Sequence, residues 1–320
     1  MTIALALLTG AFTAGWFVPN LLHRADLRRR DPVLLIVAWF VSMMGVLLAA
    51  ASAVLLLLLP GHGLSELLLT ALHQCWAAVH HGSPPRFEEA AGVTGVGLLI
   101  ALVCRVLVVS VSGLRRRTRT RQENLSVLRM IARPTTGSAD ILWLAHERPL
   151  AFSMSGRPGV VVATEGLTRH LDEHAVAAVV AHERAHLAGR HHLLVAAADA
   201  LRTALPFVPL FRVAPHTIRE LVELAADVAA VRTCGPAAVH SALLKVAGHD
   251  APGTALAMAQ DAVELRLARL RHGTPPPHGL RRAVSCGLTG ITATAMPFLT
   301  AAGLLITFAL VTCPLVDSHP

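Results

Sequence analysis

Three long stretches of the chain contain no charged residue, and they run over residues 1–22, 33–60 and 287–313. Each is long enough to cross a hydrocarbon core of about 30 Å, which needs roughly 20 helical residues. A fourth stretch, 91–114, qualifies apart from Arg105. The pattern therefore predicts four membrane-spanning helices and a lipid bilayer as a partner.

The first stretch has an alternative interpretation as a cleaved signal peptide. A signal peptide carries its positive charges before the apolar run. Here Arg24 and the arginines at 28–30 follow it. We therefore favour a retained span.

Two features of the membrane region stay open. Arg105 falls in the middle of the third predicted span, where an ionisable group usually faces a partner or a water-filled cavity, although snorkelling or a shifted span explains it equally well. His73, His80 and His81 lie between the second and third spans. Solvated loop histidines are a better interpretation of these three residues than a metal site.

Arginines set the predicted orientation, because short cytoplasmic loops carry the excess of positive charge. They follow the first and third spans and precede the fourth, at Arg281 and Arg282. We expect a multi-pass protein of the cell membrane, in bacteria the inner membrane, with both termini outside. Three spans lie within 1–114, a cytosolic domain follows at 115–286, and a short external tail at 314–320 comes after the fourth span.

Composition excludes several other classes of protein. The chain is 54% hydrophobic and has a net charge of +8. Because the arginines cluster where spans end, this charge indicates membrane orientation and no direct contact with nucleic acid. The five cysteines are scattered and have no metal-type spacing, so a cysteine zinc site is not indicated.

The cytosolic segment changes from strand-like to helical patterns along its length. Short β-type runs at 141–144, 150–154 and 160–163 predict a small antiparallel meander. Asp172 is placed to cap a helix at 173–187. Further helices are predicted at 123–133, 193–204, 218–233 and 237–248, and the apolar segment 205–211, interrupted by two prolines, is expected to lie against the membrane face. The fold class is mainly α.

His182-Glu183-Arg184-Ala185-His186 is an HExxH sequence inside the predicted helix 173–187. Helical residues four apart lie on one face, so both imidazoles can reach one Zn²⁺, with Glu183 as the general base. The apolar run 175–181 predicts a buried helix, and burial favours a preorganised site. The sequence thus predicts a zincin-like domain with one zinc ion per chain.

A catalytic zinc needs a third protein ligand. Glu223 and Asp227 lie four residues apart among small residues that permit close helix packing. Glu223 is the candidate ligand, and Asp227 is the candidate partner for the other nitrogen of a ligand histidine. The alternative is a solvated acidic stripe in which Arg219 pairs with Glu223.

Two other histidine groups are weaker candidates. His146-Glu147 has Leu150 at the fourth position and Pro149 beside it, which is incompatible with a helical pair. His170 and His174 are four apart but lack the adjacent glutamate. Neither group is expected to bind metal.

The chain resembles the BlaR/MecR-type integral-membrane metallopeptidases, relatives of the HtpX-type and CAAX-prenyl proteases. The resemblance rests on four spans, an HExxH helix between the third and fourth spans, and a downstream pattern. That pattern consists of Arg219, Glu223, Ala226 and Asp227. The similarity covers nearly the whole chain and is most specific over 152–192 and 219–230.

The resemblance implies the same roles for the site residues. His182, His186 and Glu223 would be the zinc ligands, Glu183 the general base and Asp227 a support for a ligand histidine. His191 occupies a position that is also polar in relatives and is a candidate to contact substrate. Relatives carry an extracellular penicillin-binding sensor domain after the fourth span, whereas only seven residues follow Cys313 here.

We therefore expect a membrane-bound zinc metalloendopeptidase that cuts a cytosolic or membrane-proximal protein, such as a BlaI-type repressor. A substrate strand is expected to add to the sheet edge at Leu150, Ser153 and Met154. The alternatives are an HtpX-like quality-control protease and a non-catalytic membrane sensor or scaffold.

Overall fold

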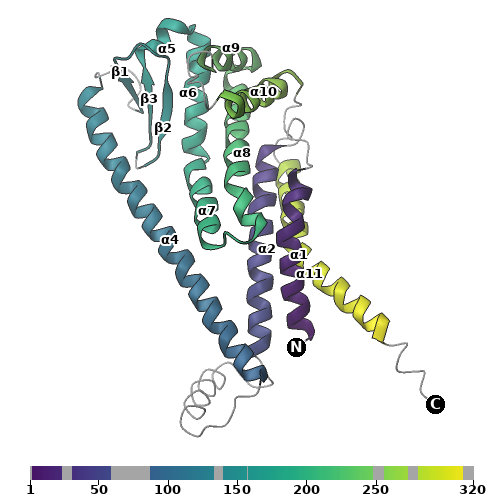
Figure 1. The fold of residues 1–320 in the computed structure, drawn as a ribbon. Helices are drawn as coiled ribbons and strands as arrows, with labels where there is room; N and C mark the ends of the chain where they lie inside the picture. Colours follow the sequence, from purple (N-terminus) through teal and green to yellow (C-terminus); the bar gives the residue numbers. More distant parts are fainter. Residues whose placement is uncertain are drawn as a thin grey trace, which may run out of the picture.

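The computed structural model describes residues 2–23, 31–58, 87–132, 140–156, 158–247, 256–272 and 280–312. Within them the chain is mainly helical, with one small sheet (Figure 1). The elements in chain order are α1 (Thr2–His23), α2 (Pro32–Leu58), α4 (Phe87–Ile131), β1 (Ile141–Leu144), β2 (Ala151–Met154), β3 (Val160–Thr164), α5 (Glu165–His170), α6 (Glu173–Ala188), α7 (His191–Ala204), α8 (Pro209–Cys234), α9 (Pro236–Ala247), α10 (Leu256–His272) and α11 (Leu280–Thr312).

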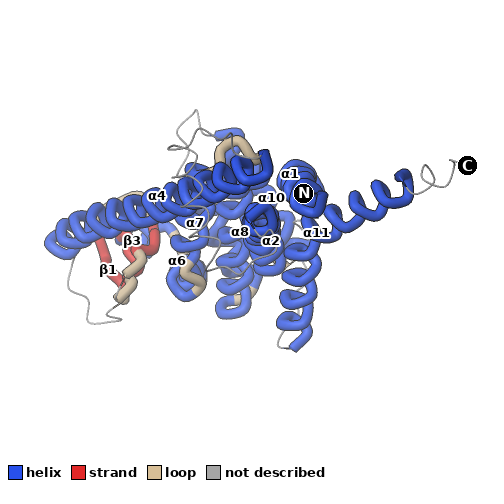
Figure 2. The backbone as a smooth tube through the Cα atoms, turned by 90° about the horizontal axis from the view of Figure 1, so that it is seen from below, coloured by secondary structure: helices blue, strands red, loops and turns tan. Residues whose placement is uncertain are grey.

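The helices α1, α2 and α11 pack against one another (Figures 1 and 2). Among the described residues, two segments are long and apolar enough to cross a membrane, Ile3–His23 and Pro32–Leu56. The third and fourth predicted spans fall in α4 and α11, and α11 holds the shorter apolar stretch Ile291–Gly303. A four-span topology therefore stays a prediction. The histidines of the predicted external loop, at 73, 80 and 81, lie outside the described residues.

Glycines allow the close packing of these helices. A Cβ added at Gly10 of α1 would lie 2.5 Å from the backbone oxygen of Pro297 in α11. A Cβ at Gly45 of α2 would lie 2.9 Å from the backbone oxygen of Thr294. Small residues at helix contacts let backbones approach closely, as is common between membrane helices.

The helix α4 is 45 residues long and continues from the third predicted span into the sheet region. The prediction of a separate short helix at 123–133 was therefore wrong. The reason is that no proline interrupts the chain between Phe87 and Ile131, and the first one beyond is Pro134. A helix continues where nothing removes its backbone hydrogen bonds.

The sheet is mixed, and the predicted antiparallel meander was wrong. Its strand order is β1-β3-β2, with β1 parallel and β2 antiparallel to β3. All five residues of β3 are buried, whereas β2 contains the exposed Phe152. A continuously apolar strand is favoured at the centre of a sheet, where both faces are covered. Figure 2 shows the strands between α4 and α6, and β2 contacts α6.

The helices after the sheet share a core with α1 and α2. One cluster of buried residues includes Ala14 of α1, Trp39 and Met43 of α2, and Leu210 and Phe211 of α8. A second cluster joins α6, α9 and β3. The segment 205–211 is thus in part the start of α8, and its Leu205, Leu210 and Phe211 are buried in the cluster shared with α1 and α2. Its expected position against the membrane face stays a prediction.

Candidate metal centre

The helix α6 presents both histidines of the HExxH sequence on one face. Its predicted start is confirmed, because the Asp172 carboxylate accepts a hydrogen bond from the Ala175 N–H, a typical N-terminal cap. Ala175, Ala178 and Val180 are buried, which fixes the rotation of the helix about its axis. His182 and His186 lie one turn apart with Nε2 atoms 3.2 Å from each other.

Glu223 of α8 completes a group of three candidate ligands. One carboxylate oxygen lies 3.3 Å from His182 Nε2 and the other 3.5 Å from His186 Nε2. All three ligand atoms lie within 4.8 Å of one another. Two ligands of a tetrahedral zinc ion, with bonds of about 2.0–2.1 Å, are roughly 3.3–3.4 Å apart. The His182–His186 separation of 3.2 Å is close to this value, and a Glu223 oxygen lies near each imidazole, so the three side chains are close enough to hold one zinc ion.

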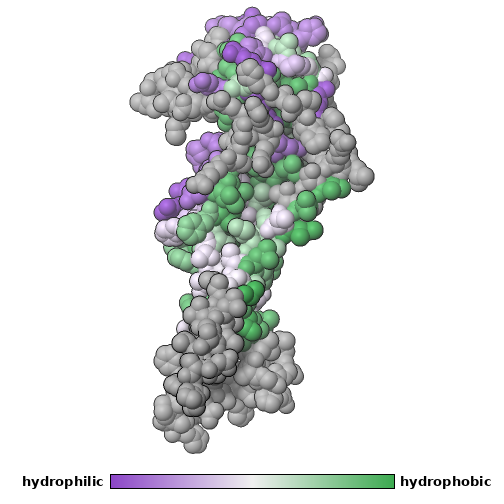
Figure 3. Space-filling view, turned by 90° about the vertical axis from the view of Figure 1, so that its right-hand side faces the viewer, coloured by the Kyte–Doolittle hydropathy of each residue, from purple (hydrophilic) through white to green (hydrophobic). Residues whose placement is uncertain are grey.

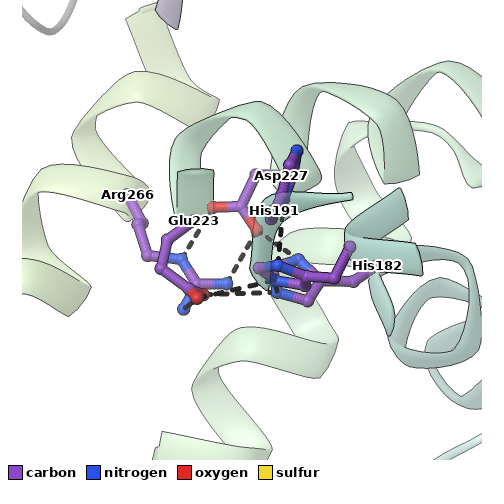
Figure 4. A network of polar contacts seen from close by, with 6 residues as sticks. His182, His191, Glu223, Asp227 and Arg266 are labelled. Atoms are coloured by element: carbon purple, nitrogen blue, oxygen red, sulfur yellow. Dashed lines mark hydrogen bonds and ion pairs between the residues drawn. The ribbon is translucent and has the colours of Figure 1, made fainter. Parts of the chain in front are cut away.

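Asp227 and Arg266 support His182 from behind (Figure 4). Asp227 Oδ1 lies 3.0 Å from His182 Nδ1, in an ion-pair contact whose angle departs from a linear hydrogen bond. The Arg266 guanidinium donates two hydrogen bonds of 2.7 Å to the same carboxylate. A carboxylate behind a ligand histidine fixes the tautomer that leaves Nε2 free for metal.

Arg266 was not anticipated from the sequence. It lies on α10, and it also approaches Glu223 Oε2 at 3.7 Å. Burial lowers the pKa of its guanidinium, but the Asp227 carboxylate outweighs this effect and raises it. Burial likewise raises the pKa of Asp227, and the contact with Arg266 brings it below its usual range. Both groups are therefore charged at neutral pH.

The side chain of His191 contacts His186, the second candidate ligand. Its Nδ1 lies 3.0 Å from Nδ1 of His186, and its side chain is buried (Figure 4). If His186 uses Nε2 for metal, its Nδ1–H donates to His191. His191 also lines the cavity described below, so its predicted contact with substrate stays untested.

Glu183 lies on α6 between the two histidines and contacts β2. Burial raises the pKa of Glu183 above its usual range, although the Ser153 hydroxyl and backbone N–H lie beside its carboxylate and act to lower its pKa. A raised pKa brings a carboxylate closer to the neutral range in which a general base both takes and returns a proton.

The two ligand histidines differ in charge when no metal is bound. Burial acts to lower the pKa of His182, but Asp227 and Glu223 outweigh it and raise the pKa to about 9. Burial lowers the pKa of His186 to about 4. At neutral pH the metal-free site therefore carries one extra proton, on His182.

A cavity of about 770 Å³ opens beside the candidate ligands. Glu223, His186 and Arg266 line it near the metal centre, and Ser153 and Ser155 line it from the side of β2. This volume is typical of a ligand site. Of the other residues predicted to meet substrate, Leu150 donates its N–H to Thr164 Oγ1, and Met154 pairs with Val160 inside the sheet.

The other residues considered as metal ligands or as a partner of Glu223 have contacts outside the candidate metal centre. His146 Nδ1 accepts a hydrogen bond from the Arg148 N–H, and His170 Nδ1 contacts the Gly166 carbonyl. Arg219 pairs with Asp199 at 2.6 Å, so the expected stripe partner of Glu223 is engaged by another residue. Among the described residues, only His182, His186 and Glu223 form a group suited to a metal ion.

A comparison with known families found one match. Residues 114–220 match peptidase family M48. The match supports a metallopeptidase, and zinc is typical of M48 peptidases. No curated protein and no solved structure matches the chain.

The M48 match and the structure contribute different parts of the site. The match includes the HExxH residues of α6 but ends at residue 220, three residues before Glu223. The assignment of Glu223, Asp227 and Arg266 to the site therefore rests on the distances in the structure.

Proposed function

We propose that this protein is a membrane-bound zinc metalloendopeptidase that hydrolyses peptide bonds of a cytosolic or membrane-proximal protein. The observation that carries the proposal is the placement of His182, His186 and Glu223 at separations that suit one zinc ion. Glu183 lies beside them and a cavity opens next to them. The match of residues 114–220 to M48 peptidases supports the same chemistry.

A zinc ion held by these three ligands would supply Lewis-acid activation of water and of a substrate carbonyl. Glu183 accepts a proton from the attacking water and returns it to the departing amine. The Ser153 hydroxyl and N–H orient the Glu183 carboxylate toward this task. Asp227, backed by Arg266, holds the His182 ring in place.

The strand β2 supports the binding of an extended substrate. It is an edge strand of the sheet, and its Ser153 faces α6 and the cavity. An exposed edge can pair with an extended peptide through backbone hydrogen bonds. We place the substrate chain along this edge, with its scissile bond near Glu183.

Membrane attachment is supported by the two long apolar helices Ile3–His23 and Pro32–Leu56. Figure 3 shows polar residues gathered at the end that holds α5 and α9, and apolar residues along the helices below it. Large apolar side chains such as Phe12 and Phe17 of α1 are exposed. Such a surface suits contact with lipid.

The resemblance to BlaR/MecR-type peptidases supports a BlaI-type repressor as substrate. The test uses the purified chain and Glu183→Gln, with a purified repressor of that class. The unsubstituted chain is expected to cleave the repressor. Glu183→Gln should bind the same amount of zinc and cleave about 10²–10⁴-fold more slowly. Full activity of zinc-loaded Glu183→Gln would contradict the proposed catalysis and favour a scaffold.

A further inference from the structure

The helices α7 and α8 form a hairpin whose tip lies between the N-terminal helices and α4 (Figure 1). The turn between them runs from Leu205 to Val208. Leu205 belongs to the buried cluster that includes Ala14 of α1 and Met43 of α2. The tip therefore reaches the middle of helices that the proposed function places in a membrane.

The depth of the tip below the membrane surface can be estimated along two neighbouring helices, α1 and α4. Val208 packs on Gly15, which lies eight residues before the end of α1 at His23, or about 12 Å along the axis. On α4 the Arg105 guanidinium contacts Thr203, and Arg105 lies nine residues before Leu114, or about 14 Å. Leu114 is exposed and is the last apolar residue before an arginine run. Both helices therefore place the tip at a similar distance from the ends of their apolar segments, about 12 to 14 Å.

Of the four residues in the turn 205–208, all but Phe207 either lack an N–H or pair it within the chain. Pro206 and Pro209 have no N–H to satisfy. The Leu205 N–H donates to the Leu201 carbonyl and the Val208 N–H to the Leu205 carbonyl. Arg105 donates to the Thr203 carbonyl at 3.0 Å, at the C-terminal end of α7. Irregular backbone at membrane depth requires such internal partners.

The side chains at the tip also suit a position in the bilayer. Phe207 is 74% exposed at the end of the hairpin. The exposed Arg202 and Arg212 lie five residues to either side of it. Arginine stems are long enough to bring their guanidinium groups from this position to the headgroup level.

We propose that the α7–α8 hairpin enters the bilayer from the side of the catalytic domain, with Phe207 in contact with acyl chains roughly 10 Å below the headgroups. This inference rests on the membrane attachment in the proposed function and does not depend on zinc or catalysis. The proposed position also gives Arg105 a role, because its guanidinium donates a hydrogen bond to a carbonyl at the C-terminal end of α7 inside the membrane.

The test replaces single residues of the full chain by the photoreactive benzoylphenylalanine and records phospholipid adducts in native membranes after illumination. The positions are Phe207, Phe12 of α1 as a lipid-facing reference, and Met130 of α4 as a polar-end reference. Phe12 is 66% exposed and Met130 78% exposed, so all three are accessible. Thermal unfolding of each purified variant first shows that the fold is retained.

The expected result is a lipid adduct at Phe207 with a yield close to that at Phe12 and about tenfold above that at Met130. An adduct at Phe12 with none at Phe207 would overturn the inference and leave membrane attachment intact. Absence of adducts at both phenylalanines would overturn membrane attachment as well. A Phe207 adduct with a second protein would identify a protein partner and overturn lipid contact.

Discussion

At the residue scale, the centre depends on a charged chain from Arg266 through Asp227 to His182. Asp227 is buried, and its carboxylate is compensated by two short hydrogen bonds from Arg266. Removing one partner of a buried ion pair leaves the other charge uncompensated. The position of the His182 ring therefore depends on a residue that is not itself a metal ligand.

Arg266→Leu is expected to lower the free energy of unfolding by about 3–5 kcal/mol because Asp227 is left unpaired. Zinc affinity should fall about 10–100-fold because the support of His182 is lost. Thermal unfolding and zinc titration measure the two effects. Arg271→Leu, at an exposed position of the same helix, is the matched control and should change neither. Equal zinc affinity in both variants would contradict the role given to Arg266.

Zinc binding is expected to release one proton per chain at pH 7. The pKa of His182 is about 9 in the metal-free chain, so the ring must lose a proton to bind, whereas His186, with a pKa of about 4, is already neutral. Affinity should therefore rise about tenfold per pH unit between pH 7 and pH 9 and level off above that. Calorimetry in buffers of different ionisation enthalpy measures the proton count. Release of no proton would contradict this charge state.

The sequence was informative about the residues whose spacing carries chemistry. His182, Glu183 and His186 are recognisable from HExxH, and Glu223 and Asp227 from a second pair of residues on one helical face. Arg266 could not be anticipated, because it lies 43 residues after Glu223 and no local pattern connects it to the site. His191 could be singled out as polar, but its contact with His186 depends on the turn before α7, where Arg190 has a φ of 48°.

At the scale of elements, the centre requires α6, α8 and β2 to converge. Helix periodicity predicted α6 within one residue, because its cap and buried face are local features. The order of the strands was not predictable in the same way. It depends on which strand the rest of the fold buries, and this is not a local feature of the sequence. The correction matters for function: a meander would have enclosed β2, whereas the order β1-β3-β2 leaves its edge open beside Glu183.

Ala151→Pro tests whether that edge binds substrate. Backbone groups two residues apart point to the same side of a strand, so Ala151 shares the open side with Ser153. Proline removes the Ala151 N–H and should raise the KM for an extended peptide about tenfold while zinc content stays unchanged. Ala151→Thr keeps the N–H and is the control. Identical kinetics for the two variants would argue against strand addition.

At the scale of the whole molecule, the predicted membrane region and cytosolic domain share one core. Average hydropathy could not reveal this, because α7 and α8 combine an apolar stripe with exposed arginines such as Arg202, Arg212 and Arg219. Their buried residues contact α1 and α2 all the same. The helix α8, which carries Glu223, is therefore packed directly against the helices that we place in the membrane.

Gly10→Ala tests the packing of these helices. The added Cβ would lie 2.5 Å from the Pro297 backbone oxygen, so α1 and α11 must separate. We expect a loss of about 1–3 kcal/mol, seen as a lower unfolding temperature in detergent. Gly97→Ala in α4 is the control, since its added Cβ meets nothing within 4 Å. A Gly10→Ala protein as stable as the control would show that this contact is absent.

The most direct test of the central claim is the zinc content of the purified chain and its Glu223→Ala variant. Glu220→Ala, one turn earlier on α8 and partnered by His216, is the matched control. One zinc per chain is predicted for the unsubstituted protein and for Glu220→Ala, and only a small fraction of one for Glu223→Ala. A full zinc ion retained by Glu223→Ala would contradict the three-residue metal centre.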